Sequence, residues 1–158
     1  MIRRLTQENE RGFTILLAAL VATLVLALGI SVFSIAQKQL ILSSLGRSSQ
    51  YAFYAADTAA ECALYWDVRF AYFSSTTPDG SPVCDGATLT VSPATPPPGQ
   101  PEYTMTFEYE PNGYCARVAI TKDTINSTTL IEADGFSTEC SEIDVSNRAL
   151  QRSVELSY

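Results

Sequence analysis

One uninterrupted apolar stretch decides the fold of this chain: Phe13–Gln37, FTILLAALVATLVLALGISVFSIAQ, which has 25 residues and no charge. As an α-helix, at about 1.5 Å per residue, it would cover roughly 37 Å, more than the roughly 30 Å of bilayer hydrocarbon. These residues are therefore predicted to form a transmembrane helix. Arg3, Arg4 and Arg11 precede it, so the positive-inside rule predicts a cytoplasmic N-terminus and export of the chain that follows.

A second helical pattern places an amphipathic helix at residues 38–66. Gln37, Lys38 and Gln39 offer no small-residue site of the kind that ends a secretory signal peptide, and no Pro interrupts residues 13–66. Small and apolar residues recur at steps of three, four and seven: Leu45, Ala52, Ala56, Ala59, Ala63 and Trp66, with Phe53 and Leu64 widening that face. The opposite face carries polar and aromatic residues: Arg47, Gln50, Tyr54, Asp57, Glu61 and Tyr65. One helix is expected to continue from the membrane onto an exported domain, with Gly29 and Gly46 as its weakest points.

The junction in front of the apolar stretch resembles the processing site of a known family. The run Arg11-Gly12-Phe13-Thr14-Ile15-Leu16-Leu17, after a short charged leader, is similar to the prepilin cleavage motif of type IV pilins and type II secretion pseudopilins. In that family a membrane-embedded prepilin peptidase cuts after the Gly and methylates the new N-terminal residue. The resemblance implies that residues 1–12 are a leader peptide, that cleavage falls between Gly12 and Phe13, and that Phe13 is N-methylated.

A second stretch narrows the resemblance to minor pilins. The alanine-rich run from Gln50 to Ala63 resembles the helix of minor pilins of the PilX and GspK type. The sequence departs from the common pilin pattern at the fifth mature position, which is often Glu and here is Leu17, and it has no Pro near Ser34. In the family that Glu meets the N-terminal amine of the neighbouring subunit. Its absence implies a place at the filament tip or in the priming of assembly.

Short strands and turns are predicted for the exported part, residues 67–158. Loops are expected at residues 74–86 and 92–101, which are rich in Ser, Thr, Pro and Gly. Strands are expected at Ala87–Val91, Glu102–Glu110, Tyr114–Lys122, Thr128–Ala133 and Ala149–Tyr158. Pro111-Asn112-Gly113 predicts a hairpin turn, and Arg152, on the apolar face of the last strand, indicates a sheet edge. The prediction is a pilin-like α+β fold, with a long N-terminal helix packed on a small antiparallel sheet.

Four cysteines, Cys62, Cys84, Cys115 and Cys140, all follow the predicted span. An even count in an oxidising compartment predicts two disulfides, and proximity along the chain favours Cys62 with Cys84 and Cys115 with Cys140. Each would close a loop of roughly twenty-five residues and stabilise the domain by about 3 kcal/mol. Two alternatives remain: a zinc site built from all four thiolates, although there is no C-x-x-C pair, or free thiols.

Composition excludes several classes of function. The chain has no His, which rules out imidazole bases, His metal ligands and Ser-His or Cys-His pairs. Its net charge of -7 repels phosphate backbones, so bulk nucleic-acid binding is not expected. Asp57 and Glu61 lie four residues apart, as a general acid and base do in some sites, but they are expected to be solvated. No calcium-loop spacing links the C-terminal acidic residues Glu132, Asp134, Glu139, Glu142 and Asp144. An enzyme, a metal site and a cofactor are therefore not expected.

Two functions remain. The leading one is a minor pilin or pseudopilin, a structural subunit at the tip of a type IV pilus or related filament or in the priming of its assembly. Its partners would be other pilin subunits, the prepilin peptidase, the assembly machinery of the inner membrane, and membrane lipid. It would begin as a single-pass membrane protein and reach the cell surface after assembly. The alternative is a membrane-anchored binding or adhesion domain that never polymerises. Cleavage after Gly12 separates the two, because a simple anchor keeps its leader.

Overall fold

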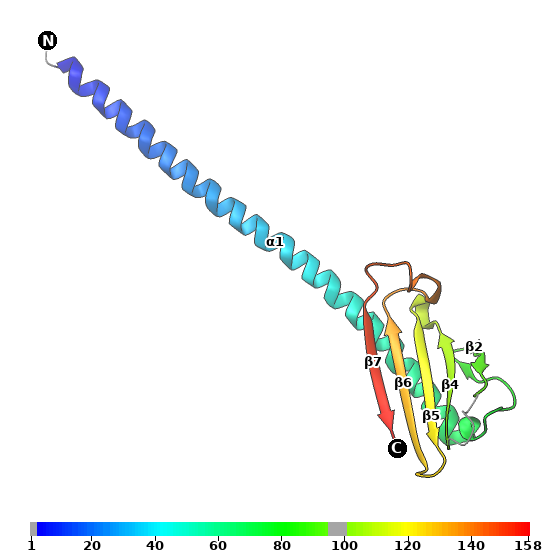
Figure 1. Ribbon diagram of the computed structural model, residues 1–158. Helices are drawn as coiled ribbons and strands as arrows, with labels where there is room; N and C mark the ends of the chain where they lie inside the picture. Colours follow the sequence, from blue (N-terminus) through cyan, green and yellow to red (C-terminus); the bar gives the residue numbers. More distant parts are fainter. Residues whose placement is uncertain (1–2, 95–100) are drawn as a thin grey trace. The chain divides into compact units, whose positions relative to one another are not determined.

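The structure, a computed structural model, describes residues 3–94 and 101–158, with side chains described from Gly12 onward. The chain begins with one long helix, α1 (Arg3–Phe70), and the strands follow it. Contacts divide the chain into two compact units, one ending at Ser44 and one spanning Leu45–Tyr158, so α1 contributes to both (Figure 1). The predicted continuous helix is confirmed, and it passes through Gly29 and Gly46 without a break.

The described residues of the first unit all belong to α1, and the composition of this unit favours a helix. Leu and Ala dominate it and Pro is absent from residues 13–44. Three of its hydroxyl groups, those of Thr23, Ser31 and Ser44, donate hydrogen bonds to carbonyl oxygens within the helix. Thr23 Oγ1 donates to the Leu20 carbonyl at 2.9 Å, and Ser31 Oγ donates to the Leu28 carbonyl at 2.9 Å. These polar side chains therefore add little cost to an apolar environment.

In the second unit the last part of α1 lies along one face of an antiparallel sheet (Figure 1). The sheet is a meander in the order β3 (Val91–Ser92), β4 (Glu102–Tyr109), β5 (Ala116–Asp123), β6 (Thr128–Phe136) and β7 (Gln151–Ser157). A separate ribbon pairs β1 (Val83–Cys84) with β2 (Ala87–Thr88). Three 3-10 turns connect these elements: η1 (Tyr72–Ser74), η2 (Pro111–Gly113) and η3 (Cys140–Glu142). The predicted α+β fold is confirmed.

The core lies between the sheet and α1. β4 alternates as predicted, with Tyr103, Met105, Phe107 and Tyr109 buried and the residues between them exposed. From α1 the buried residues are mostly alanines: Ala52, Ala55, Ala56, Ala59, Ala60 and Ala63. Since Ala has the smallest side chain after Gly, this face allows the helix backbone to approach the sheet closely.

Gly135 in β6 marks the closest approach of the helix to the sheet. A Cβ built at this position would lie 1.9 Å from the Ala52 carbonyl oxygen and 2.6 Å from the Ala56 nitrogen. Atoms at those distances overlap, so a larger residue would push α1 away from the sheet. The alanines of α1 and the single glycine of β6 thus form one close-packed contact.

Three sequence-based expectations need correction. The single strand expected at Ala87–Val91 is two short strands, β2 and β3, in different sheets, and β1 lies inside the loop expected at residues 74–86. Leu45 and Phe53, expected on the buried face of the helix, are 44% and 45% exposed. Helical periodicity alone could not show that contact with the sheet begins only near Ser48. Most of the expected connector, residues 95–100, lies outside the described residues.

β7 forms one edge of the sheet, as Arg152 predicted. The Arg152 guanidinium lies on the helix side of this strand and donates from Nε to Ser49 Oγ at 2.7 Å. The hairpin expected after β4 is also present. Asn112 and Gly113 adopt positive φ values of 55° and 79° in η2, and β5 follows at Ala116. The positive φ at Gly113 explains the use of glycine in this turn.

Candidate functional site

The most unusual surface of the molecule is the apolar segment of α1, defined here as Phe13–Leu45. Eighteen large hydrophobic side chains in it are 44–73% exposed. Of the exposed large hydrophobic residues in the described part of the chain, all but Val83, Ile125, Val145 and Tyr158 lie on α1. The surface of a soluble protein does not normally expose so continuous an apolar area, so the segment needs lipid or protein around it.

α1 is long and apolar enough to cross a membrane. The helical stretch Gly12–Phe70 contains a window of mean hydropathy 2.8, and none of that window is buried within the molecule. A core helix of a soluble protein would be mostly covered by its own domain. This exposure therefore agrees with a single-pass membrane anchor.

The residues of the expected processing site lie within α1. Phe13 and Leu17 are 66% and 52% exposed, and nothing lies within 4 Å of a Cβ built at Gly12. The leader side chains before Gly12 lie outside those that the structure describes. The side chains of Phe13 and Leu17 are thus exposed within the described part of α1.

Two disulfides join the elements of the second unit, and they match the predicted pairs. Cys62 of α1 pairs with Cys84 of β1, with their Cα atoms 6.0 Å apart. Beside this bond the Trp66 indole Nε1 donates to the Val83 carbonyl oxygen at 3.1 Å. The disulfide and the indole hydrogen bond together hold the β1–β2 ribbon against the helix.

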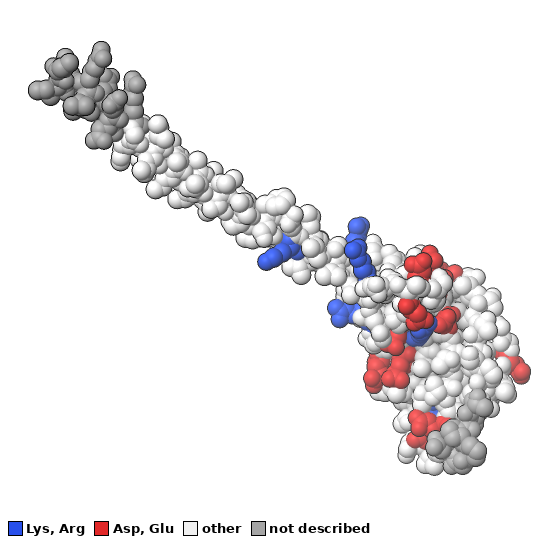
Figure 2. Space-filling model, turned by 45° about the horizontal axis from the view of Figure 1, so that its top comes forward, with Lys and Arg blue, Asp and Glu red and all other residues white. Residues whose placement is uncertain are grey.

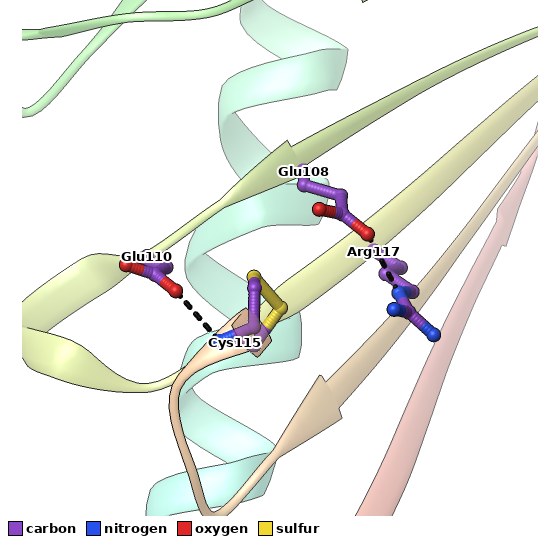
Figure 3. The surroundings of a disulfide bond; sticks show 5 residues. Glu108, Glu110, Cys115 and Arg117 are labelled. Atoms are coloured by element: carbon purple, nitrogen blue, oxygen red, sulfur yellow. Dashed lines mark hydrogen bonds and ion pairs between the residues drawn. A yellow bond between two sulfur atoms is a disulfide. The ribbon is translucent and has the colours of Figure 1, made fainter. Parts of the chain in front are cut away.

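The second disulfide closes the C-terminal loop of the domain (Figure 3). Cys115, directly before β5, pairs with Cys140 of η3, and their Cα atoms are 4.7 Å apart. The Glu110 carboxylate accepts a 2.6 Å hydrogen bond from the Cys140 backbone nitrogen, while Glu108 and Arg117 form an ion pair at 2.8 Å. With all four cysteines in disulfides, the alternative zinc site is not formed in this structure.

A polar cluster that the sequence did not predict ties the end of α1 to the sheet. The Asp67 carboxylate is buried and accepts hydrogen bonds from Lys122 Nζ, at 2.5 Å, and from the Tyr158 hydroxyl. Lys122 also donates to Thr129 Oγ1 at 2.8 Å. The sequence did contain a sign of this cluster, since Asp67 lies one turn after Ala63 on the buried face of the helix. A carboxylate at such a position needs a partner.

Two tyrosines around this cluster hold their protons more strongly than a free side chain. Burial, the hydrogen bond to Asp67 and the negative charge of Asp67 raise the pKa of the Tyr158 hydroxyl. Burial and the same charge raise the pKa of Tyr103, whose hydroxyl donates to the Phe73 carbonyl at 2.9 Å. Both tyrosines therefore act as neutral hydrogen-bond donors: Tyr158 holds the end of α1, and Tyr103 holds the η1 turn that follows it.

The acidic residues considered for catalysis or calcium binding are distributed over three parts of the second unit. Asp57 and Glu61 lie on the outward face of α1, half-buried and exposed respectively. Glu132 and Asp134 lie on the outer face of β6, whereas Glu139, Glu142 and Asp144 lie in and around η3. No group of three possible metal ligands occurs among the residues that the structure describes. In Figure 2 carboxylates are spread over the visible face of the second unit.

Comparisons with protein-family models, curated proteins and solved structures give no match to this chain.

Proposed function

We propose that this chain is a minor pilin or pseudopilin, a structural subunit of a type IV pilus or a related filament. The observation that carries the proposal is the exposed apolar segment of α1, Phe13–Leu45, which ends in a separately folded unit stapled by two disulfides. The sequence Arg11-Gly12-Phe13 at its start, which resembles a prepilin processing site, supports the same function.

The length of the apolar segment favours a filament subunit over a simple anchor. Its 33 residues correspond to about 50 Å of helix, about 20 Å more than the hydrocarbon of a bilayer. In a simple anchor the excess, including Leu40, Ile41, Leu42 and Leu45, would lie in water. Fully burying an aliphatic side chain of this size is worth about 1.5–3 kcal/mol, so leaving four of them uncovered costs several kcal/mol. Helices of neighbouring subunits would cover them in a filament.

The absence of Glu at the fifth mature position favours a role at the filament tip or in priming. After cleavage, each subunit would carry a positively charged N-terminus inside an apolar helix bundle, where an unpaired charge costs several kcal/mol. Leu17 offers no carboxylate to the neighbouring subunit above it. A subunit at the tip has no such neighbour and needs no charge pair.

The proposed role implies a defined set of partners and places. The chain would be inserted with a cytoplasmic N-terminus, cleaved and methylated at Phe13 by prepilin peptidase, and passed with other pilin subunits to the assembly machinery in the membrane. Membrane lipid would cover the apolar segment before assembly. The role needs no catalytic residue, metal or cofactor.

The tip role is tested by counting this subunit in sheared, purified filaments from its native host. A trace amount relative to the most abundant pilin, together with loss of filaments when its gene is deleted, is the expected result. A copy number close to that of the most abundant pilin would contradict the tip role. Absence from filaments, with normal filament numbers after deletion, would reject the filament function and leave the non-polymerising anchor.

Leu17→Glu provides a matched variant for the same measurement. The new carboxylate would pair with a neighbouring N-terminus, so the variant is expected in larger amounts along the filament. Leu17 lies in the first unit and makes no part of the domain core. Thermal unfolding of the second unit should therefore be unchanged, which shows that any redistribution comes from assembly.

A further inference from the structure

The last two turns of α1 carry an outward apolar face with a charge at each end. Glu61, Leu64, Tyr65, Val68 and Arg69 line a shallow hollow on the surface. Tyr65 and Val68 are 55% and 70% exposed, although they lie at the end of the helix that is anchored to the sheet. The floor of the hollow is apolar, and its only charged groups are the Glu61 carboxylate and the Arg69 guanidinium.

Both of these charged residues lack a partner within the described part of the chain. The ion pairs found there are Arg117 with Glu108 and Lys122 with Asp67. Glu61 and Arg69 are exposed and lie eight residues apart, about 12 Å along the helix, too far for a pair within one chain. Tyr65 lies midway between them, so the face has opposite charges at equal distances from its centre.

This arrangement is self-complementary. If a second copy of the helix lies antiparallel across Tyr65, Glu61 of each copy faces Arg69 of the other, and the apolar residues meet between the two pairs. A contact that uses the same surface on both copies is the requirement for a two-fold symmetric dimer. We propose that this face, Glu61–Arg69, binds the same face of a second copy of the chain.

The proposed contact places the Glu61–Arg69 stretches of the two copies in opposite directions. It is independent of whether the chain polymerises, because a simple anchor would present the same face.

The small size of the face predicts a weak contact. One helix face of two turns buries less than the roughly 1,200 Å² at the lower end of stable interfaces, so single pairs should exchange rapidly. Many copies reconstituted on two facing vesicle surfaces would act together and make the contact measurable. Exposed ion pairs are screened by salt, so docking should weaken as the ionic strength rises.

Docking of vesicles tests the proposal with the full chain. The protein is reconstituted in phosphatidylcholine vesicles and vesicle clustering is followed by light scattering. Wild-type vesicles should cluster. E61R vesicles alone and R69E vesicles alone should cluster about fivefold or more slowly, because two attractive pairs become repulsive in each. Mixing E61R vesicles with R69E vesicles should restore clustering, because the two variants again carry opposite charges at both positions.

R47E provides the matched control, since Arg47 lies on the same outward face but outside the proposed contact. R47E vesicles alone should cluster like wild type. When mixed with E61R vesicles they should cluster more slowly than R69E vesicles do, although R47E and R69E carry the same net charge. The proposal is overturned if wild-type vesicles fail to cluster, if R69E vesicles cluster like wild type, or if R47E restores clustering of E61R vesicles as well as R69E does.

Discussion

The two parts of α1 carry two different kinds of apolar surface. Up to Leu45 the helix exposes large aliphatic side chains, and no part of the described chain covers them. From Ala52 to Ala63 it buries small side chains against its own sheet. Large exposed residues create a surface that other molecules must cover, whereas alanines let the backbone approach its own domain. The first part of the helix is thus long and apolar enough to span a membrane, and the second part belongs to the core of the folded domain.

Gly135→Val is expected to have the largest effect, because it disturbs the close packing of the second part of α1 on the sheet. The added side chain would overlap the backbone of α1 at Ala52 and Ala56, so the free energy of unfolding of the second unit should fall by about 3 kcal/mol or more. Urea unfolding in detergent, followed by fluorescence of Trp66, the single tryptophan, measures the change.

Gly29→Val is the control for this substitution, because a Cβ at Gly29 meets nothing within 4 Å and the residue lies in the first unit. It should leave the unfolding of the second unit unchanged. Equal effects of the two substitutions would mean that the two parts of α1 do not differ as described.

Asp67→Ala is expected to have the next largest effect. It removes the acceptor for Lys122 and Tyr158, and it leaves Lys122, whose side chain is only 17% exposed, without its counter-charge. Breaking a buried pair in this way costs about 3–5 kcal/mol, and partial exposure of Lys122 places the expected loss near the lower end. The double variant with Lys122→Met should regain part of the loss in the same urea experiment. No recovery would mean that the loss does not come from the unpaired charge of Lys122.

Cys115→Ser should lower the free energy of unfolding by about 3 kcal/mol, because the loop up to Cys140 is then open in the unfolded chain. The backbone hydrogen bond from Cys140 to Glu110 should weaken as well, since the disulfide holds η3 in place. Hydrogen exchange of residues 137–145 should rise, while that of β4 should change little. Unchanged hydrogen exchange in residues 137–145 would mean that this disulfide does not hold η3 in place.

The smallest expected effect is on the pH dependence of stability. The pKa of Tyr158 is raised in the folded chain by burial and by Asp67, and that of an unfolded Tyr is about 10. The folded state then holds the proton more strongly, so its stabilisation is complete below about pH 10 and is lost as the pH rises further. The unfolding free energy of wild type should fall more steeply above pH 10 than that of Tyr158→Phe. Parallel curves would show that Tyr158 does not couple to folding.

Sequence reasoning predicted the long helix, the alternation of β4 and the disulfide pairs because each depends on local periodicity or on distance along the chain. It did not predict Gly135, since the need for glycine there arises from a helix more than seventy residues earlier. The same holds for the cluster of Asp67, Lys122 and Tyr158, which joins three distant segments. Leu45 and Phe53 were misplaced because periodicity gives the apolar face of a helix but not where its contact with a sheet begins.

The central claim, that the first part of α1 is a processed assembly segment, is tested most directly by the N-terminal mass of the protein extracted from membranes of its native host. The prepilin-like function predicts a chain that begins at Phe13 with a methylated amine, and a Gly12→Val variant that keeps residues 1–12. A native chain that begins at Met1 in cells with active prepilin peptidase would contradict the claim.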